Sequence, residues 1–394
     1  MAAAAAGSCA PRRRWKDQPI SKPRGCRMPP SLESSALPAA AGTQPALLSS
    51  KPNFARIAEV AGVSPSTVDR VLNNRGSVSA KTHRKVVSAA RELGARRMLP
   101  ALVRGPYRFD VVYTQTDATH AARLERALRQ AATTLGKPVS LLSTMWKGES
   151  QTRLADFIVR PRHRRDGLIV VANDELRMKD AVAKAIAAGT PTVSMACDLS
   201  GVDGAAFVGI DNRAAGRLAG QLAGAMSGGR GRALVLCPSL GYQDHRQRAE
   251  GFIEVARRDF PGLQIDGPIE LRDDPARARQ VVSRRFSTGL GVQAIYNTGG
   301  SSEAIAGTVA SVGRQQRPLW LGHDACQAHL GLLEEGLLSL VIDQDLDQQA
   351  LNALQYLLHQ LQDAQAPRAL QTLFHVVTRA NAHLYRRGER LAAA

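Results

Sequence analysis

Short apolar runs alternate with amphipathic helical stretches from Arg108 onward, and this alternation limits the fold of most of the chain. The runs that read as strands are FDVVY, VSLLS, GLIVVA, PTVSM, AFVGI, ALVLC, VQAIY, LWLGH, SLVI and LFHVV. The stretches between them, such as HAARLERALRQAATTLG and NRAAGRLAGQLAGAM, are rich in Ala and Arg and have helical spacing. Repeated strand–helix units predict an α/β fold with parallel sheets flanked by helices. Because about ten strands are too many for one small sheet, two similar lobes are expected.

Positive charge is concentrated in the N-terminal quarter of the chain. Of the formal net charge of +18, residues 1–50 carry +5, residues 51–108 carry +9, and the remaining 286 residues carry about +4. A basic segment joined to a near-neutral body indicates a nucleic-acid-binding head on a different kind of domain. A solvated basic tail would account for residues 1–50, which are rich in Ala, Pro and Ser and are expected to be disordered. It would not account for residues 51–108, which also have helical periodicity and helix caps.

Three helix starts and stops follow one another in this basic segment. Each helix has a residue suited to capping its first turn, and the second has a proline at its first position, where the missing N–H is tolerated. The expected helices run over 54–61, from Pro65 to about Asn73, and from 80 to Gly94, with Asn53, Ser64 and Ser79 as their caps. Two short helices joined by a tight glycine turn, with a third that closes the core, predict a helix-turn-helix. A generic small helical bundle is the alternative.

The second of these helices would enter the major groove of DNA, with its N-terminal residues nearest the bases. Hydroxyl groups and helix N-termini suit phosphate oxygens, whereas Arg and Asn can form paired hydrogen bonds with a base edge. The outward-facing residues of this helix and its cap are Ser64, Pro65, Ser66, Asp69, Arg70 and Asn73. Asp69 has two interpretations: it orients Arg70 or another nearby arginine, or it accepts a hydrogen bond from cytosine N4.

The stretch IAEVAGVSPSTVDRVLNNRGSVSAKTHRKVVSAARELG resembles the DNA-binding domain of the lac-repressor (LacI/GalR) family of bacterial transcription regulators. The similarity spans about forty residues and includes Ala61-Gly62-Val63-Ser64, Thr67-Val68, Arg70-Val71-Leu72-Asn73 and Val78-Ser79. The resemblance implies a dimer that binds a pseudo-palindromic operator. It also implies contacts to DNA from the second helix, at Ser64, Pro65, Ser66, Arg70 and Asn73, and contacts to phosphates at Asn53, Ser79 and Thr82.

Two features depart from that family. Asp69 stands where the family usually has a small polar residue. The family's Tyr-x-Pro-Asn motif and minor-groove hinge helix are replaced here by ARRMLPALVRGPYR. In this segment Arg96 and Arg97 can still bind phosphate, but Pro100 and Gly105 fit a helix poorly. The sequence therefore predicts a linker and leaves open whether it forms a minor-groove hinge.

Polar side chains follow nearly every predicted strand of the body, where ligands bind in folds of this kind. Any one of these residues could be a helix N-cap, but their recurrence at one strand end after another predicts a site. Paired contacts from Asp, Asn, Gln and Arg suit a sugar or polyol better than an apolar ligand. The residues are Gln115, Thr116, Asp117, His120, Asp198, Asp211, Asn212, Asp244, Arg248, Asn297, Asp324, Asp343 and Gln344.

The body also resembles the type I periplasmic-binding-protein fold that serves as the effector domain of the same family. The similarity covers about residues 107–380 and rests on VGIDNRAAGRLAG, RQRAEGF, AIYNTGG, WLGHD and VIDQD. It implies a sugar-binding set of Asp198, Arg248, Asn297, Asp324 and Gln344. The first lobe would add Asp117, His120 and Trp146, and Trp146 is either an aromatic platform for the sugar or a core residue.

Other functional classes fit the sequence less well. A dinucleotide-binding enzyme needs G-x-G-x-x-G directly after a strand, but GGRGRA precedes one, and NTGGSSEA lacks a Walker lysine. The sequence has no Ser-His-Asp order, no paired acids in helical register and no metal-spaced histidines, and its five scattered cysteines form no C-x-x-C. No catalytic residue, metal site or cofactor is therefore predicted. No apolar run is long enough to span a membrane.

The sequence thus predicts five parts: a disordered basic tail (1–50), a helix-turn-helix domain (51–97), a linker or hinge (98–107), a two-lobed effector-binding and dimerisation domain (108–380) and a C-terminal tail (381–394). The expected function is that of a ligand-responsive transcription regulator, a repressor of carbohydrate or polyol metabolism genes. Its expected partners are double-stranded operator DNA, a sugar, polyol or sugar-phosphate effector and a second copy of the chain, in the bacterial cytoplasm at the nucleoid. The alternatives are a periplasmic-type sugar-binding protein, or a dehydrogenase-like α/β enzyme with a basic extension.

Overall fold

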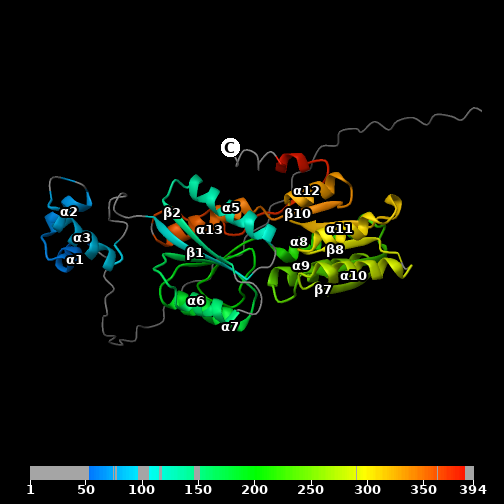
Figure 1. Ribbon diagram of the computed structural model, residues 1–394, viewed down its shortest axis with the longest axis horizontal. Coiled ribbons are helices and arrows are strands. Elements are labelled where there is room, and N and C mark those ends of the chain that lie inside the picture. Colours follow the sequence, from blue (N-terminus) through cyan, green and yellow to red (C-terminus); the bar gives the residue numbers. More distant parts are fainter. Residues whose placement is uncertain are drawn as a thin grey trace, which may run out of the picture. The chain divides into compact units, whose positions relative to one another are not determined.

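A computed structural model describes residues 53–73, 75, 78–95, 106–114, 118–145, 151–289, 291–361 and 363–386. In these ranges the chain forms a head of three helices and a body of two α/β lobes (Figure 1). In this part of the chain, no helix is long and apolar enough to cross a membrane.

The head packs three short helices around a small apolar core. They are α1 (Phe54–Ala61), α2 (Pro65–Leu72) and α3 (Ala80–Glu92). The three expected caps are confirmed, since each cap side chain accepts a hydrogen bond from a first-turn N–H: Arg56 to Asn53, Thr67 to Ser64 and Thr82 to Ser79. The core is made by residues at helical spacing, among them Ile57, Val68, Val71, Val86 and Ala90.

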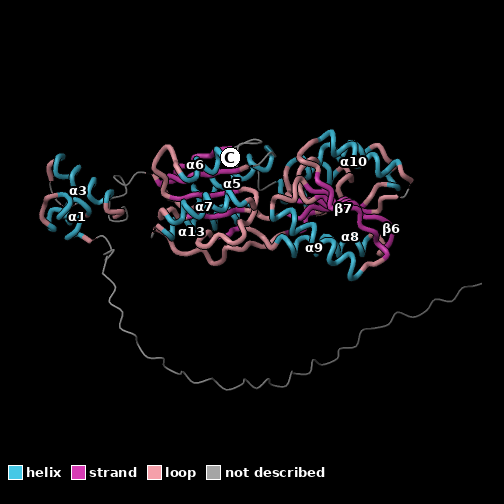
Figure 2. The backbone as a smooth tube through the Cα atoms, turned by 90° about the horizontal axis from the view of Figure 1, so that it is seen from below, coloured by secondary structure: helices cyan, strands magenta, loops and turns pink. Residues whose placement is uncertain are grey.

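The first lobe is a parallel sheet with strands in the order β2-β1-β3-β4-β5. The strands are β1 (Tyr107–Tyr113), β2 (Val139–Met145), β3 (Gly167–Val171), β4 (Thr192–Met195) and β5 (Ala206–Val208). Helices cover both faces of the sheet (Figure 2): α5 (Ala118–Thr134) and α13 (Leu346–Gln360) on one, α6 (Gln151–Val159) and α7 (Leu176–Ala187) on the other. Because both faces are buried, the central strands read as continuous apolar runs.

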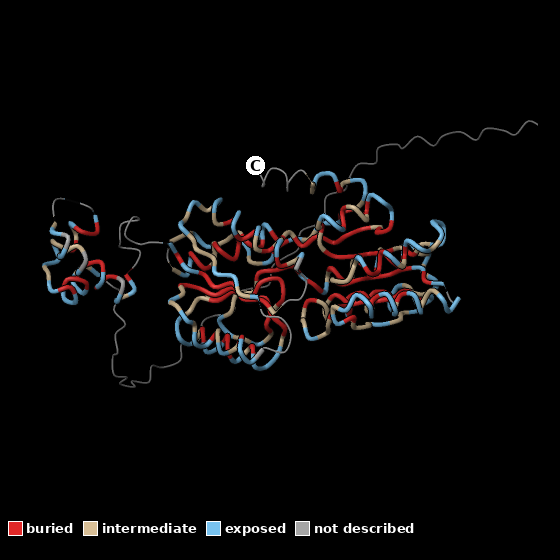
Figure 3. Tube along the Cα trace, viewed as in Figure 1, coloured by how far each residue is buried: buried red, intermediate tan, exposed pale blue. Residues whose placement is uncertain are grey.

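The second lobe repeats this plan with strands in the order β11-β10-β9-β8-β6-β7. They are β6 (Arg230–Cys237), β7 (Gly262–Glu270), β8 (Ala294–Asn297), β9 (Leu319–His323), β10 (Leu340–Asp343) and β11 (His375–Val377). One face is covered by α8 (Asn212–Met226) and α9 (Gln243–Asp259), the other by α10 (Pro275–Ser287), α11 (Ser302–Ala310) and α12 (Gln327–Glu334). A 3-10 turn, η2 (Arg314–Gln316), precedes β9. In both lobes the central strands are buried and the helices expose one side (Figure 3).

All ten predicted strands form, but two edges of the second sheet differ from the expectation. β7 was not among the predicted strands because GLQIDGPIE alternates polar and apolar residues and contains a proline. It is an edge strand whose residues are mostly half-buried or exposed, so it does not need an apolar run. At the other edge, β11 pairs with β10 in the antiparallel direction, so this sheet is not purely parallel.

The chain passes between the lobes three times: from β5 to α8, from β10 to α13, and from α13 to β11. The third passage is tied to the first, because the N–H of Thr372 donates to the carbonyl of Gly209 at 2.9 Å. Helix α13 packs in the core of the first lobe, although most of the second lobe precedes it in the sequence. The lobes are therefore discontinuous in sequence and share one set of connections.

Candidate functional site

A cavity of about 60 Å³ lies where the two lobes meet. Its wall is built from residues that follow the carboxyl ends of strands, such as Ala196 after β4, Pro238 after β6, Asp324 after β9 and Gln344 after β10. The first lobe also contributes His120, from the start of α5. This is the position that the sequence predicts for a ligand site, because loops at one edge of a parallel sheet converge there.

Arg248 is a buried cation that three hydrogen bonds hold in place. Its side chain extends from α9 and the residue is 1% exposed. The bonds run from Nε to Oδ1 of Asn212 at 2.8 Å, from Nη1 to the Thr298 carbonyl at 2.9 Å, and from Nη2 to Oε1 of Gln344 at 3.4 Å. A guanidinium fixed in this way loses little conformational freedom when it binds a ligand oxygen.

The backbone around Arg248 is positioned by an unusually close contact between α8 and α9. A Cβ atom added to Gly216 would lie 2.1 Å from the carbonyl oxygen of Arg248, and one added to Gly251 would lie 2.2 Å from the carbonyl oxygen of Arg213. Only glycine allows two helices to approach this closely. The NRAAGRLAG stretch therefore sets the distance between the helices and, with it, the place of Arg248.

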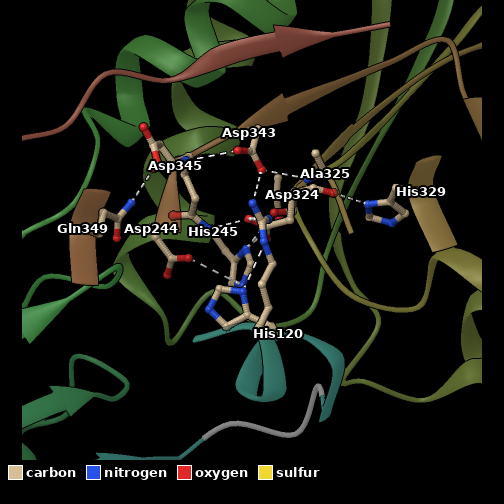
Figure 4. A network of polar contacts seen from close by, with 12 residues as sticks. His120, Asp244, His245, Asp324, Ala325, His329, Asp343, Asp345 and Gln349 are labelled. Carbon is tan, nitrogen blue, oxygen red and sulfur yellow. Dashed lines mark hydrogen bonds and ion pairs between the residues drawn. The ribbon is translucent and has the colours of Figure 1, made fainter. Parts of the chain in front are cut away.

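Asp324 is the carboxylate at the centre of the polar network in Figure 4. Its Oδ1 accepts a hydrogen bond from Nε2 of Gln344 at 2.8 Å, and its Oδ2 lies 3.5 Å from Nδ1 of His120. Burial opposes the charge, but His120, Arg123 and Arg248 together hold the pKa of Asp324 well below its usual range. The site therefore contains a fixed, ionised carboxylate beside a fixed guanidinium, a pairing that can bind neighbouring hydroxyl groups.

Arg123, on α5 of the first lobe, reaches two carboxylates of the second. Its Nη2 donates to Oδ1 of Asp343 at 2.8 Å, and its Nη1 lies 3.5 Å from Oδ1 of Asp324. The lobes are also joined at the cavity wall by Tyr242, whose hydroxyl donates to the carbonyl of Thr114 at 3.0 Å. Because residues of both lobes meet at the cavity wall, a ligand in the cavity would touch both lobes.

Asp244 lines the cavity, but the predicted effector set omits it. Its Oδ1 is buried with no hydrogen-bond partner among the described residues. Although burial opposes ionisation, the nearby His245 and Arg248 hold the pKa of Asp244 below its usual value. A buried carboxylate oxygen without a donor is costly, so it is suited to accept a ligand hydroxyl. The sequence signal was its position one helical turn before Arg248 on α9.

Two predicted effector residues lie next to the cavity and do not form its wall. Asp198 accepts a hydrogen bond from Oγ of Ser194 at 3.4 Å, and burial raises its pKa. Asn297 donates from Nδ2 to the carbonyl of Gly300 at 2.7 Å and so holds the glycine loop that follows β8. Their observed contacts are those of residues that shape the site.

The remaining predicted effector residues divide into two groups. His120, Arg248, Asp324 and Gln344 are brought together on the cavity wall, where Cys197, Tyr242, His245 and Asp273 join them. Asp117 and Trp146 lie outside the described residues. In the described part of the chain, no group of three His, Cys, Asp or Glu residues could hold a metal ion.

The residues predicted to contact DNA lie at the helix starts of the head and along α2. Most are exposed: Asn53, Ser64, Pro65, Ser66, Arg70, Asn73 and Ser79, with Asp69 and Thr82 half-buried. The carboxylate of Asp69 accepts a hydrogen bond from Nδ2 of Asn73 at 2.6 Å, one turn along the helix. The hydrogen-bond partner of Asp69 is thus the amide of Asn73, whereas the first interpretation expected an arginine, and Arg70 is exposed.

The stability of the body is expected to pass through a maximum between about pH 6.5 and 7. Burial lowers the pKa of His245 and of His323, so below the usual His pKa of about 6.5 the unfolded state binds more protons and stability falls with falling pH. Burial also opposes charge on His329, but its hydrogen bond to Cys326 raises its pKa to about 9. The contribution of His329 to the free energy of unfolding is therefore complete below about pH 6.5, and it is lost as the pH rises through 9. Denaturant titrations at several pH values measure the free energy of unfolding and so locate this maximum.

The replacement His329→Gln should flatten the alkaline side of that profile and leave the acid side unchanged. The matched control is His383→Gln, since His383 is exposed. A profile whose alkaline slope survives in His329→Gln would contradict the assignment.

Two families match the chain. Residues 55–96 match the family described as bacterial regulatory proteins, lacI family, and residues 109–365 match the family described as periplasmic binding protein domain. Over 43 residues the chain is 51% identical to the sucrose operon repressor of Pediococcus pentosaceus. That alignment covers 11% of this chain and only 13% of the repressor.

The body is similar in structure to proteins that bind sugars. It matches GanP, a glucose-galactose binding protein from Geobacillus stearothermophilus, with a TM-score of 0.62 and 20% identity over 70% of this chain and 98% of that one. It also matches an ABC transporter periplasmic solute binding protein from Actinobacillus succinogenes with bound D-allose, with a TM-score of 0.63 and 17% identity over 71% of this chain and 100% of the other. At these identities the similarity establishes the fold alone.

Proposed function

Because the chain belongs to the lacI family of bacterial regulatory proteins, with a periplasmic binding protein domain as its body, we propose that it is a sugar-responsive transcriptional repressor. The head binds double-stranded operator DNA, and the cavity between the lobes binds a small polyhydroxylated effector. The sucrose operon repressor and the sugar-binding proteins named above support this assignment by analogy.

The observation that carries the proposal is the cavity wall itself. It holds a fixed guanidinium on Arg248, an ionised carboxylate on Asp324 and an unpartnered buried carboxylate oxygen on Asp244. A sugar hydroxyl both donates and accepts, so vicinal hydroxyls can satisfy such groups in pairs. An apolar ligand would bury them without partners. A polyol or sugar therefore fits this chemistry best.

The proposed mechanism couples the cavity to the heads of a homodimer in the bacterial cytoplasm. Both lobes contact the ligand, so binding favours one arrangement of the lobes over others, and the lobes carry the heads that read operator half-sites. Such coupling is typically worth about 1–3 kcal/mol, or roughly 5- to 150-fold in operator affinity. The ligand is expected to lower the affinity for the operator and so to relieve repression.

A thermal-shift screen of sugars, polyols and sugar phosphates, followed by DNA-binding measurements with each hit, tests this function. A ligand that binds only the folded protein raises its melting temperature. The expected result is a sugar that stabilises the protein and changes its affinity for an operator fragment selected from random DNA. The proposal fails if the protein binds no DNA with steep salt dependence, or if no sugar that binds changes operator affinity.

The replacement Asp69→Ser is expected to raise affinity for all DNA sequences slightly and to weaken discrimination at one base pair. DNA affinity rises because the replacement removes a negative charge from a surface that faces phosphate. The loss follows because Asn73 would no longer be held by its hydrogen bond to Asp69, and a well-oriented Asn is worth about 1–3 kcal/mol of discrimination. Binding to a panel of operators with single base-pair changes measures both effects.

The matched control is Glu59→Ser, which removes one exposed acid from α1 whose ion-pair partner, Arg56, is on the same helix. It should give only the uniform gain. If Asp69→Ser behaves identically to Glu59→Ser at every base pair, Asp69 does not orient Asn73.

A further inference from the structure

A second, larger chamber of about 540 Å³ opens beside the cavity of about 60 Å³. The two share a boundary formed by His120, Asp273, Gly299, Gly300 and Asp324. The larger chamber falls in the range of about 300–1,000 Å³ that is usual for ligand pockets. A ligand seated at the shared boundary has most of its available space in the larger chamber.

The larger chamber is polar, and its charges are balanced. Its walls carry three cationic groups, on Arg123, Arg279 and His329, whose pKa is raised to about 9, and three carboxylates, on Asp273, Glu303 and Asp324. Hydroxyl groups stand between them at the start of α11, on Ser301 and Ser302. A charged ligand of either sign would therefore meet as many like charges as opposite ones. Neutral groups that both donate and accept hydrogen bonds suit such a wall.

Two buried polar atoms on this wall have no hydrogen-bond partner among the described residues. His323 is 1% exposed and bonds to the Tyr296 hydroxyl through Nε2, but its Nδ1 is unpartnered. Nη1 of Arg123 is likewise buried without a hydrogen bond, although it faces Asp324 at 3.5 Å. Buried polar atoms are rarely left unpaired, so both atoms indicate that a ligand with acceptor and donor groups belongs in the chamber.

We propose that the effector is a neutral carbohydrate of at least two sugar rings. The first ring lies at the shared boundary, beside Asp324, with its hydroxyls directed toward Arg248 and Asp244, and the next ring lies in the chamber beside Arg279. This proposal rests on the proposed function and specifies its ligand class. A single ring would use one part of this site and leave most of the chamber to water. The second ring supplies the hydroxyls that the mixed wall of Arg279, Glu303 and Ser302 can bind in pairs.

Isothermal titration calorimetry with matched ligands tests this on the full-length protein. The probes share one ring and differ beyond it: glucose, maltose, sucrose and glucose 6-phosphate, with the corresponding galactose and fructose series. The expected result is a disaccharide that binds at least tenfold more tightly than its component monosaccharides. The replacement Arg279→Ala should weaken that disaccharide about tenfold and leave the monosaccharide unchanged. The matched control is Arg284→Ala on the same helix, which is exposed and does not line the chamber, and it should change neither.

Three outcomes would overturn the proposal. A monosaccharide that binds as tightly as every disaccharide containing it would show that the chamber adds no contacts. Preference for the 6-phosphate would assign the chamber to an anion. An equal loss for both ligands in Arg279→Ala would place Arg279 at the first ring or in the fold. Each of these leaves the proposed function intact, because that function fails only if the protein binds no DNA with steep salt dependence or if no sugar that binds changes operator affinity.

Discussion

Replacing Arg248 with methionine is expected to weaken effector binding by about 2–5 kcal/mol, or roughly 30-fold to several thousand-fold. Methionine fills much of the same space, so the change is mainly the loss of a buried charge that three hydrogen bonds had fixed. Ligand oxygens that had displaced water to reach the guanidinium would then lack a donor. Calorimetry with a sugar from the thermal-shift screen gives the affinity, and fluorescence anisotropy with operator DNA without the sugar shows that the head still binds.

The matched control for this experiment is Arg257→Ala, an exposed arginine in the last turn of the same helix. It should bind the sugar with unchanged affinity. If the Arg248 variant also binds the sugar normally while its DNA response is intact, the ligand does not sit against α9 and the assignment of the cavity is wrong.

Replacing Gly216 with alanine is expected to destabilise the body by about 1–3 kcal/mol or more, the usual range for overpacking a close contact. The added methyl group would lie 2.1 Å from the carbonyl oxygen of Arg248, and backbone cannot give way as a flexible side chain can. Helices α8 and α9 must therefore separate, which also moves Arg248 and lowers sugar affinity. Thermal and denaturant unfolding measure the first effect, and calorimetry measures the second.

The control is Gly307→Ala in another helix, and this replacement is expected to raise the stability of the body. Gly307 is exposed in α11, and a Cβ atom there would meet nothing within 4 Å. Alanine stabilises a helix interior by about 0.5–1 kcal/mol relative to glycine. Equal behaviour of the two variants would mean that the close contact between α8 and α9 relaxes without strain, and that Gly216 does not set the place of Arg248.

The elements that local sequence decides could be predicted well. The caps of the head depend on one side chain and an N–H three residues later, and Asn53 and Ser64 carry that information themselves. The buried strands were visible as apolar runs because both faces of each sheet are covered. β7 was missed for the same reason, since an edge strand with half-buried residues has no such run.

The candidate site was less predictable because its members come from separate loops. Strand ends indicated the edge of the sheets where the cavity lies, but not which side chain turns into it. Asp198 and Asn297 follow strands as Asp324 does, yet both satisfy their polar atoms with near neighbours, Ser194 and Gly300. Asp244 was among the polar residues that follow predicted strands, but that position did not separate it from the others. Its role depends on the cavity wall that the folded lobes make together, which no single stretch of sequence describes.

Helix α13 has a consequence for how the protein is made. The strands of the first lobe are the first part of the body to leave the ribosome, but the apolar face that α13 covers stays open until translation has passed residue 360. By then nearly the whole second lobe has been synthesised. The lobe that is translated first is therefore completed only after most of the second lobe has been made, and a nascent chain stopped within the second lobe exposes the kind of apolar surface that chaperones bind. Helix α13 thus makes the two lobes depend on one another for folding as well as for ligand binding.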